Sequence, residues 1–210
     1  MRKAFVLVTL ACLSVAGCSD SSSSRVPESL PVTSVNFEIV HASQDAPAVN
    51  LSLGGDVISN GTDFSEAVFA TTEAGELTVE VEGIIPGGNA TVISATASFT
   101  DGQRVTIFAA NDVANIEPII LIDDQPEVAD TDVRVRVVHA ASNVTPIADM
   151  VDIYVTAPDD LISSATPFTL MFGDSTAAVT VPAGDYRIRV TPAMSPDAVV
   201  YDSGTLPLSG

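Results

Sequence analysis

Apolar and polar residues alternate along two stretches of this chain, residues 35–43 and 133–142, and the two stretches resemble each other. In each, apolar residues at every second position lead into two consecutive apolar residues, a His-Ala pair and a serine. Strict alternation places one face of a strand against a core and the other in water, so each stretch is predicted to be a β-strand. Because the pattern occurs twice, we expect an all-β chain built from two similar domains in tandem.

The rest of the first copy reads as short strands separated by turns rich in Gly, Pro, Asn and Asp. Asn60-Gly61 is expected to form a turn, and Pro118 is expected to mark an edge strand. Seven or eight strands in about 90 residues predict an antiparallel β-sandwich of immunoglobulin-like size. The predicted strands are 35–41, 49–53, 56–58, 64–71, 77–82, 91–99, 104–110 and 116–122.

The second copy repeats this order of residues but stops earlier. Its last matches are 199–201 and 205–208, and counterparts of 103–110 and 116–122 are missing. We therefore expect the second sandwich to be incomplete and the sequence to be a fragment of a longer protein. The matched pairs are 49–53 with 151–155, Phe64 with Phe172, and 74–79 with 183–188. The expected boundaries are 34–124 for the first repeat, 125–132 for an acidic linker and 133–210 for the truncated second repeat.

The N-terminal segment is predicted to be a targeting signal. Arg2 and Lys3 precede a short apolar run that ends in Val15-Ala16-Gly17-Cys18. This resembles the signal of bacterial lipoproteins, which implies a signal peptide over 1–18 and lipidation of Cys18, with the membrane as a partner through that anchor. Residues 19–33, rich in serine, are predicted to be a flexible tether. Under the sorting rule of that class, Ser19 favours the outer membrane over the inner membrane.

The charge balance excludes one class of partner. The chain carries a formal charge of −19, and after removal of Arg2 and Lys3 six arginines stand against 27 carboxylates, which gives −21. Such a surface repels phosphate backbones, so no nucleic acid partner is expected.

Few residues offer catalytic chemistry. The histidines His41 and His139 end equivalent strands and are expected to be structural, with the imidazole bonded to loop carbonyls. Ser43 and Asp45 are too close to His41 in sequence for a convergent catalytic triad. Residues 173–175, Gly-Asp-Ser, are similar to an esterase nucleophile block, but the Asp-x-x-His block of that family has no counterpart here. No catalytic residue is therefore assigned.

Metal ligands are also scarce. Two histidines in separate repeats, with no cysteine left after lipidation, cannot build a four-ligand zinc site. The acidic junction is the weak candidate for calcium, because carboxylates are the ligands that this ion prefers. Its members are Asp123, Asp124, Glu127, Asp130 and Asp132. No other metal site and no cofactor is expected.

The repeated motif resembles a known family. Residues 41–50, His-Ala-Ser-Gln-Asp-Ala-Pro-Ala-Val-Asn, and residues 181–186, Val-Pro-Ala-Gly-Asp-Tyr, are similar to domain-of-unknown-function family 4397 (DUF4397). The resemblance implies extracytoplasmic β-domains, often in tandem and often on lipoproteins, and it supplies no catalytic residue. Residues 143–149 replace the Asp-Ala-Pro loop in the second copy.

These observations lead to one hypothesis and one alternative. We expect a membrane-anchored lipoprotein of the cell envelope that acts as a non-catalytic binding or structural module for an envelope protein or glycan. The alternative is an extracytoplasmic carboxylate-dependent hydrolase, for which the carboxylates are too numerous to nominate a pair. A deep pocket with two carboxylates roughly 5–9 Å apart would favour the hydrolase.

Overall fold

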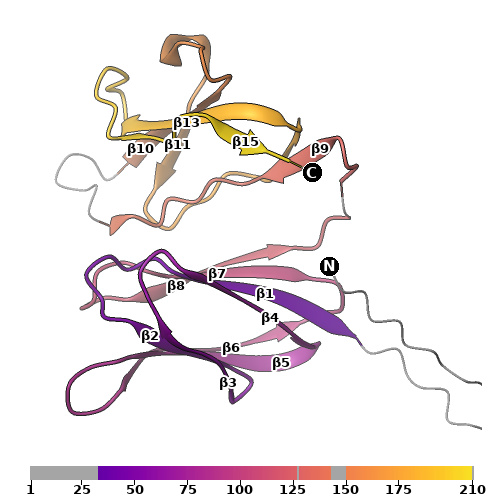
Figure 1. The fold of residues 1–210 in the computed structure, drawn as a ribbon, viewed down its shortest axis with the longest axis vertical. Coiled ribbons are helices and arrows are strands. Elements are labelled where there is room, and N and C mark those ends of the chain that lie inside the picture. Colours follow the sequence, from indigo (N-terminus) through magenta and orange to yellow (C-terminus); the bar gives the residue numbers. More distant parts are fainter. Residues whose placement is uncertain (1–32, 127, 143–149, 210) are drawn as a thin grey trace, which may run out of the picture. The chain divides into compact units, whose positions relative to one another are not determined.

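A computed structural model of the chain describes residues 33–126, 128–142 and 150–209. The predicted signal peptide with Cys18, all of the predicted tether except its last residue, Glu127 and the loop 143–149 lie outside the described residues. Within the described ranges the fold is all-β, with a short 3-10 turn at Ile162–Ser164 (Figure 1). No helix in this part of the chain is long and apolar enough to cross a membrane.

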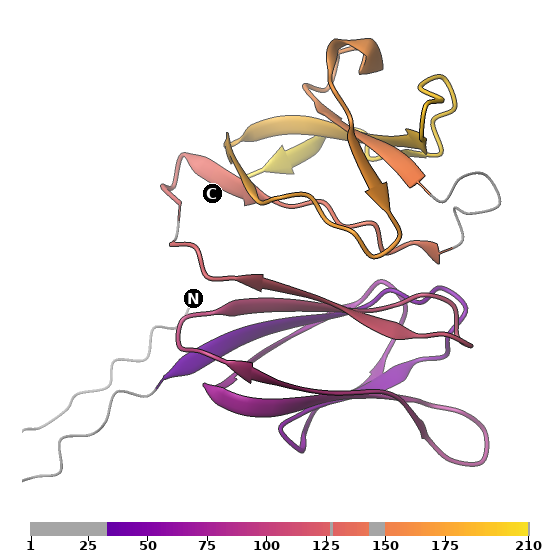
Figure 2. The same ribbon diagram turned by 180° about the vertical axis from the view of Figure 1, so that it is seen from behind.

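The first repeat is a sandwich of two four-stranded sheets, seen as two layers in Figure 2. One sheet has the order β4-β1-β7-β8, with bounds Ala67–Glu73, Ser34–His41, Arg104–Ala110 and Glu117–Asp123. The other has the order β3-β2-β5-β6, with bounds Asp56–Thr62, Val49–Leu53, Gly75–Gly83 and Ala90–Phe99. The predicted sandwich is confirmed, and Pro118 lies in β8, which is an edge strand as predicted.

The core of this sandwich follows the alternation in the sequence. Along β1, the side chains of Val35, Phe37 and Ile39 are each at most 2% exposed, whereas the residues between them face outward. Phe37 meets Phe99 of β6 edge to face, with ring centroids 5.0 Å apart, so the two sheets interlock across the core. Thirteen buried apolar residues form this cluster.

Two details of the predicted sandwich are wrong. Strand β7 pairs with β1 in parallel, because the chain crosses to the other sheet before returning; every other strand pair in the described residues is antiparallel. Asn60-Gly61 is not a turn but lies inside β3, where the register against β2 shifts. Gly61 has a φ of +72° and donates its N–H to Asn50 Oδ1 at 3.2 Å, so the glycine lies in a β-bulge.

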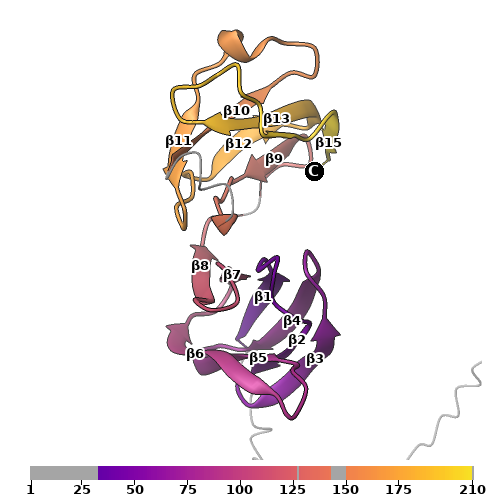
Figure 3. The same cartoon turned by 90° about the vertical axis from the view of Figure 1, so that its left-hand side faces the viewer.

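The second repeat follows the same order of pairing with fewer strands (Figure 3). A two-stranded sheet, β12-β9, corresponds to β4-β1, and its strands span Val179–Pro182 and Asp132–Val135. The other sheet has the order β11-β10-β13-β14, and β15 also pairs with β13. Its strands are Phe168–Met171, Met150–Thr156, Gly184–Pro192, Tyr201–Asp202 and Leu206–Leu208. Among the described residues no strand stands where β7 and β8 stand in the first repeat.

A shared contact supports the equivalence of the two repeats. His41 meets Phe64 edge to face at 6.4 Å between ring centroids, and His139 meets Phe172 in the same way at 6.1 Å. The second core is much smaller, because only Val151, Ile153 and Leu170 form a buried apolar cluster in the described part of this repeat.

Candidate functional site

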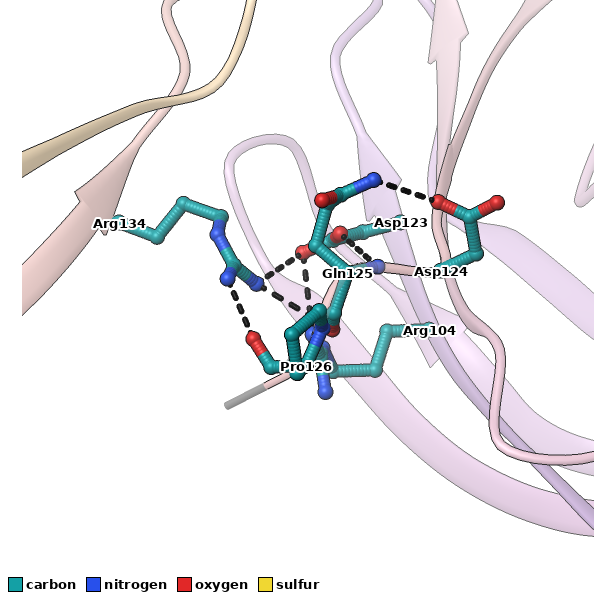
Figure 4. Close-up of polar contacts among 6 residues, drawn as sticks. All are labelled: Arg104, Asp123, Asp124, Gln125, Pro126 and Arg134. Atoms are coloured by element: carbon teal, nitrogen blue, oxygen red, sulfur yellow. Dashed lines mark hydrogen bonds and ion pairs between the residues drawn. The ribbon is translucent and has the colours of Figure 1, made fainter. Parts of the chain in front are cut away.

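The most connected polar group lies where the first repeat ends, at Asp123 (Figure 4). Asp123 is the last residue of β8 and Arg104 is the first of β7; the two are direct partners in the antiparallel pairing. Asp123 Oδ2 accepts hydrogen bonds from Arg104 Nη2 at 3.2 Å and from Arg134 Nη1 at 3.1 Å. Its Oδ1 accepts the backbone N–H of Gln125 at 2.9 Å. We call Arg104, Asp123, Gln125, Pro126 and Arg134 the junction cluster.

The two arginines of the junction cluster also hold the chain that follows β8. Arg104 Nη2 donates to the carbonyl of Gln125 at 2.7 Å, and Arg134 Nη2 donates to the carbonyl of Pro126. Burial raises the pKa of Asp123, but the bonds from Gln125 and from both arginines outweigh it, so the pKa lies below the usual 3.8. The carboxylate therefore stays charged at neutral pH and is a poor proton donor.

The calcium candidates divide around this cluster. Asp123 is engaged by two guanidinium groups, whereas Asp124 accepts a hydrogen bond from Gln125 Nε2 at 3.1 Å. The described residues contain no group of three or more His, Cys, Asp or Glu side chains placed to hold a metal. Glu127 lies outside the described residues, so calcium at the junction stays a prediction.

A cleft with a volume of about 740 Å³ opens beside the junction cluster. Its lining includes Arg136 as well as the two arginines of the cluster, together with the aromatic rings of Phe69 and Phe108. Phe69 is 74% exposed, which is unusual for a phenylalanine and leaves its ring free to contact another molecule. Four carboxylates also line the cleft: Glu38, Asp123, Asp130 and Asp132.

Arg136 differs from the other arginines of the described residues. Arg187 donates to both carboxylate oxygens of Asp202, at 2.9 and 2.5 Å, and Arg189 donates to Thr156 Oγ1 at 2.7 Å. Bonding to Arg187 holds the pKa of Asp202 at about 2. Within the part of the chain that the structure describes, Arg136 makes no ion pair or side-chain hydrogen bond. Among the described arginines it is therefore the one most available to a ligand.

His41 is structural, as the sequence suggested. Its ring is 1% exposed, Nδ1 accepts the N–H of Ser43 at 3.3 Å, and Nε2 then donates to the carbonyl of Pro47 at 3.0 Å. The hydroxyl of Ser43 donates to Asp45 at 3.4 Å instead of to the imidazole. Both ring nitrogens are thus used by the backbone, and the His-Ser-Asp set has no nucleophile activated by histidine.

His139 occupies the equivalent position with different surroundings. It is 5% exposed, and its Nε2 has no hydrogen-bond partner among the described residues. Residues 173–175 form the turn beside it, where Asp174 accepts the backbone N–H of His139 at 2.9 Å through its carbonyl. Burial lowers the pKa of His139 below 6.5, although the charge of Asp174 acts in the opposite direction.

The burial of His139 has a measurable effect on its titration. In an NMR titration of the two histidine ring signals, the signal lost in His139→Gln is expected to titrate with a midpoint below 6.5, because burial disfavours the imidazolium. As the pH drops, the imidazole is protonated in the unfolded state before it is protonated in the folded state. Its contribution to the free energy of unfolding should therefore fall between pH 6.5 and the lowered pKa, and His139→Gln should remove this contribution. A titration midpoint of His139 at or above 6.5 would show that burial does not lower its pKa.

Sequence reasoning missed a buried polar face in the second repeat. The alternation of β10 predicts that Asp152 and Tyr154 face water, yet they are 6% and 5% exposed. The Asp152 carboxylate accepts hydrogen bonds from the hydroxyl of Thr169 at 2.6 Å and from the backbone N–H of Met194 at 2.9 Å. The chain after β13 therefore folds back over this sheet.

Comparison with known proteins places the chain at the level of a family. A crystal structure of a DUF3823 family protein from Bacteroides ovatus aligns with 84% of this chain and 98% of its own, at 10% identity and a TM-score of 0.25. No curated protein matches the chain. The family described as a domain of unknown function, DUF4397, matches residues 35–148, which is more than half of the chain and contains the first repeat from Val35 onward, with its His-Ala motif. The protein therefore belongs to the DUF4397 family, as the repeated motif predicted.

Proposed function

We propose that this protein is a lipid-anchored protein of the bacterial cell envelope whose β-repeats bind an envelope component without converting it chemically. The observation that carries the proposal is the sequence Val15-Ala16-Gly17-Cys18, which ends an apolar run and precedes a serine-rich segment. Acyl chains on Cys18 would hold the protein at a membrane, since each buried CH₂ contributes about 0.8 kcal/mol. The anchored β-repeats would then bind an envelope component that lies within reach of the predicted tether.

The cleft beside the junction cluster is the binding surface that we propose. Its exposed aromatic ring, Phe69, offers a flat apolar contact, and Arg136 offers a cation that has no ion-pair partner among the described residues, on a chain that is otherwise strongly acidic. Aromatic and arginine side chains carry much of the binding energy in protein interfaces. An envelope protein or glycan with an anionic group fits this combination.

The geometry of the polar groups supports binding over catalysis. Asp123 is held by two arginines with a lowered pKa, and both nitrogens of His41 bond the backbone. A general acid needs a raised pKa near the operating pH, which is the opposite of the shift at Asp123. The carboxylate-dependent hydrolase is kept as the alternative, because other carboxylates line the same cleft.

Site-specific cross-linking in intact cells tests this proposal. A photoreactive residue at Phe69 is expected to capture a discrete envelope component. The same residue at Val57, which is 60% exposed on β3 in the other sheet, is expected to capture none. Equal capture at both positions, or none at either, would overturn the assignment of the cleft.

A further inference from the structure

The methionines of the second repeat lie close together on one face of a sheet. The chain has four methionines, and those within the described residues are Met150, Met171 and Met194. Met150 and Met171 are direct partners in the antiparallel pairing of β10 with β11, two strands that are adjacent in Figure 3. Directly opposed residues project from the same face of a sheet, with Cβ atoms about 5 Å apart. The two thioether side chains therefore project side by side.

Met194 lies over the same face. The residue before it, Ala193, donates its N–H to the carbonyl of Met150 at 3.1 Å, and the N–H of Met194 donates to Asp152 Oδ2 at 2.9 Å. Asp152 is two residues from Met150 on β10, so both side chains are on the face opposite to the core residues of that strand. Because methionine has a flexible, unbranched side chain, the sulfur of Met194 can turn toward the other two.

Packing in the core does not account for these methionines. Met150, Met171 and Met194 are 41%, 53% and 89% exposed, whereas methionine usually fills gaps in a hydrophobic core. Met194 also has a φ of +63°, a conformation that favours glycine or asparagine in a turn. Neither burial nor the turn therefore explains a methionine at this position.

The first repeat shows that the fold does not require sulfur at these positions. By the matched pairs of the two repeats, the three positions are held there by Ala48, Asp63 and Ile85. The main chain is held in the same way, because the N–H of Ile84 donates to the carbonyl of Ala48 at 2.9 Å, as its counterpart does to Met150. The three thioethers are thus a property of the second repeat and not of the shared fold.

We propose that Met150, Met171 and Met194 form a binding site for a soft monovalent metal ion, which in the cell is Cu(I). Thioether sulfur is a soft, neutral ligand that selects Cu(I) over calcium and magnesium, which prefer oxygen. The site goes beyond the proposed function and uses no residue of the cleft. The ion binds in the oxidation state in which it is supplied, so no electron transfer is involved.

Two carboxylates lie beside the three thioethers. Asp174 Oδ2 accepts the N–H of Met171 at 3.0 Å, and Asp152 accepts the hydroxyl of Thr169 as well as the N–H of Met194. Their negative charge attracts a cation to a site whose own ligands are neutral. Because both oxygens of Asp152 accept hydrogen bonds, we assign Asp152 to positioning Met194 and not to binding the ion.

Titration of the full-length protein in detergent with Ag(I) tests this proposal. Ag(I) shares the preference of Cu(I) for soft ligands and is not oxidised in air, and the buffer contains no chloride. With methionine methyl groups labelled with ¹³C, the NMR signals of Met150, Met171 and Met194 are expected to shift together. The shift should saturate at one Ag(I) per chain, and Zn(II) should leave the signals in place.

Variants without one sulfur identify the ligands. Met150→Leu, Met171→Leu and Met194→Leu each keep the shape of the side chain and remove the thioether, so each should lower the affinity for Ag(I) about tenfold or more. Leu161→Ala, at another exposed apolar residue of the second repeat, is the matched control and should leave the affinity unchanged. Cu(I), kept reduced with ascorbate and measured against a coloured chelator, should give the same order of affinities.

Three results would overturn the site. Signals that shift independently and need more than one Ag(I) per chain would show three separate surface thioethers. Unchanged affinity in any of the three leucine variants would remove that methionine from the site, and an equal response to Zn(II) would exclude selection by sulfur. Cross-linking at Phe69 tests the proposed function separately, so failure of the metal site leaves that proposal in place.

Discussion

Replacement of Cys18 by serine is expected to abolish incorporation of labelled palmitate into this protein, from full labelling to none. The thiol is the acceptor of the lipid in the signal that residues 15–18 resemble, and a serine hydroxyl does not replace it. A chain whose residues 1–18 are exchanged for an ordinary cleaved signal peptide should move from the membrane fraction to the soluble fraction, because no acyl chain remains to bury. Metabolic labelling and fractionation of intact cells measure both results.

Cys12 supplies the matched control for this experiment. It is the only other cysteine, and it lies within the segment that is predicted to be a cleaved signal peptide. Cys12→Ser is therefore expected to keep full labelling and membrane association. Labelled protein from the Cys18→Ser variant would show that the anchor is elsewhere.

Replacement of Ile107 by alanine is expected to lower the free energy of unfolding of the first repeat by about 3 kcal/mol. Ile107 is fully buried at the centre of β7, where it closes the core against β1 and its loss leaves a cavity. Its cross-strand partner Ile120 is 38% exposed, so Ile120→Ala is the matched control and should cost under about 1 kcal/mol. Urea unfolding followed by far-UV circular dichroism measures the difference.

The tyrosines separate the two repeats in the same experiment. Tyr154, Tyr186 and Tyr201 all lie in the second repeat, and the chain has no tryptophan. Tyrosine fluorescence therefore reports on the second repeat, whose apolar cluster is separate from the first. Its midpoint should stay unchanged in Ile107→Ala, and a shift of both signals together would show that the repeats unfold as one unit.

The sequence predicted strand bounds best where one face of the strand is exposed to solvent. Period-two alternation follows directly from the pleat, so β2 and β7 begin and end where the pattern predicted. Which strands pair was harder to predict, since the parallel pairing of β1 with β7 joins residues that are far apart in sequence. The turn signal of Asn60-Gly61 failed because the register of β3 against β2 uses the glycine for a bulge.

The candidate site was predictable only in part. Arg104 and Asp123 are partners in the β7–β8 hairpin, so a careful register of the two predicted strands would have brought them together. The contact of Arg134 with Asp123 depends on the path of the linker, for which the sequence offers no periodic signal. Burial of Asp152 could not be read from its strand, because the cover comes from the residues after β13.

Binding of an envelope component without its chemical conversion can be measured in a sedimentation assay with isolated cell-envelope material. The full-length protein in detergent is mixed with that material, and both bound protein and the masses of the envelope molecules are measured. We expect saturable co-sedimentation that weakens in Phe69→Ala and Arg136→Glu, with the envelope molecules unchanged in mass. New, shorter envelope molecules that appear only with the protein would show that it is a hydrolase and not a binding module.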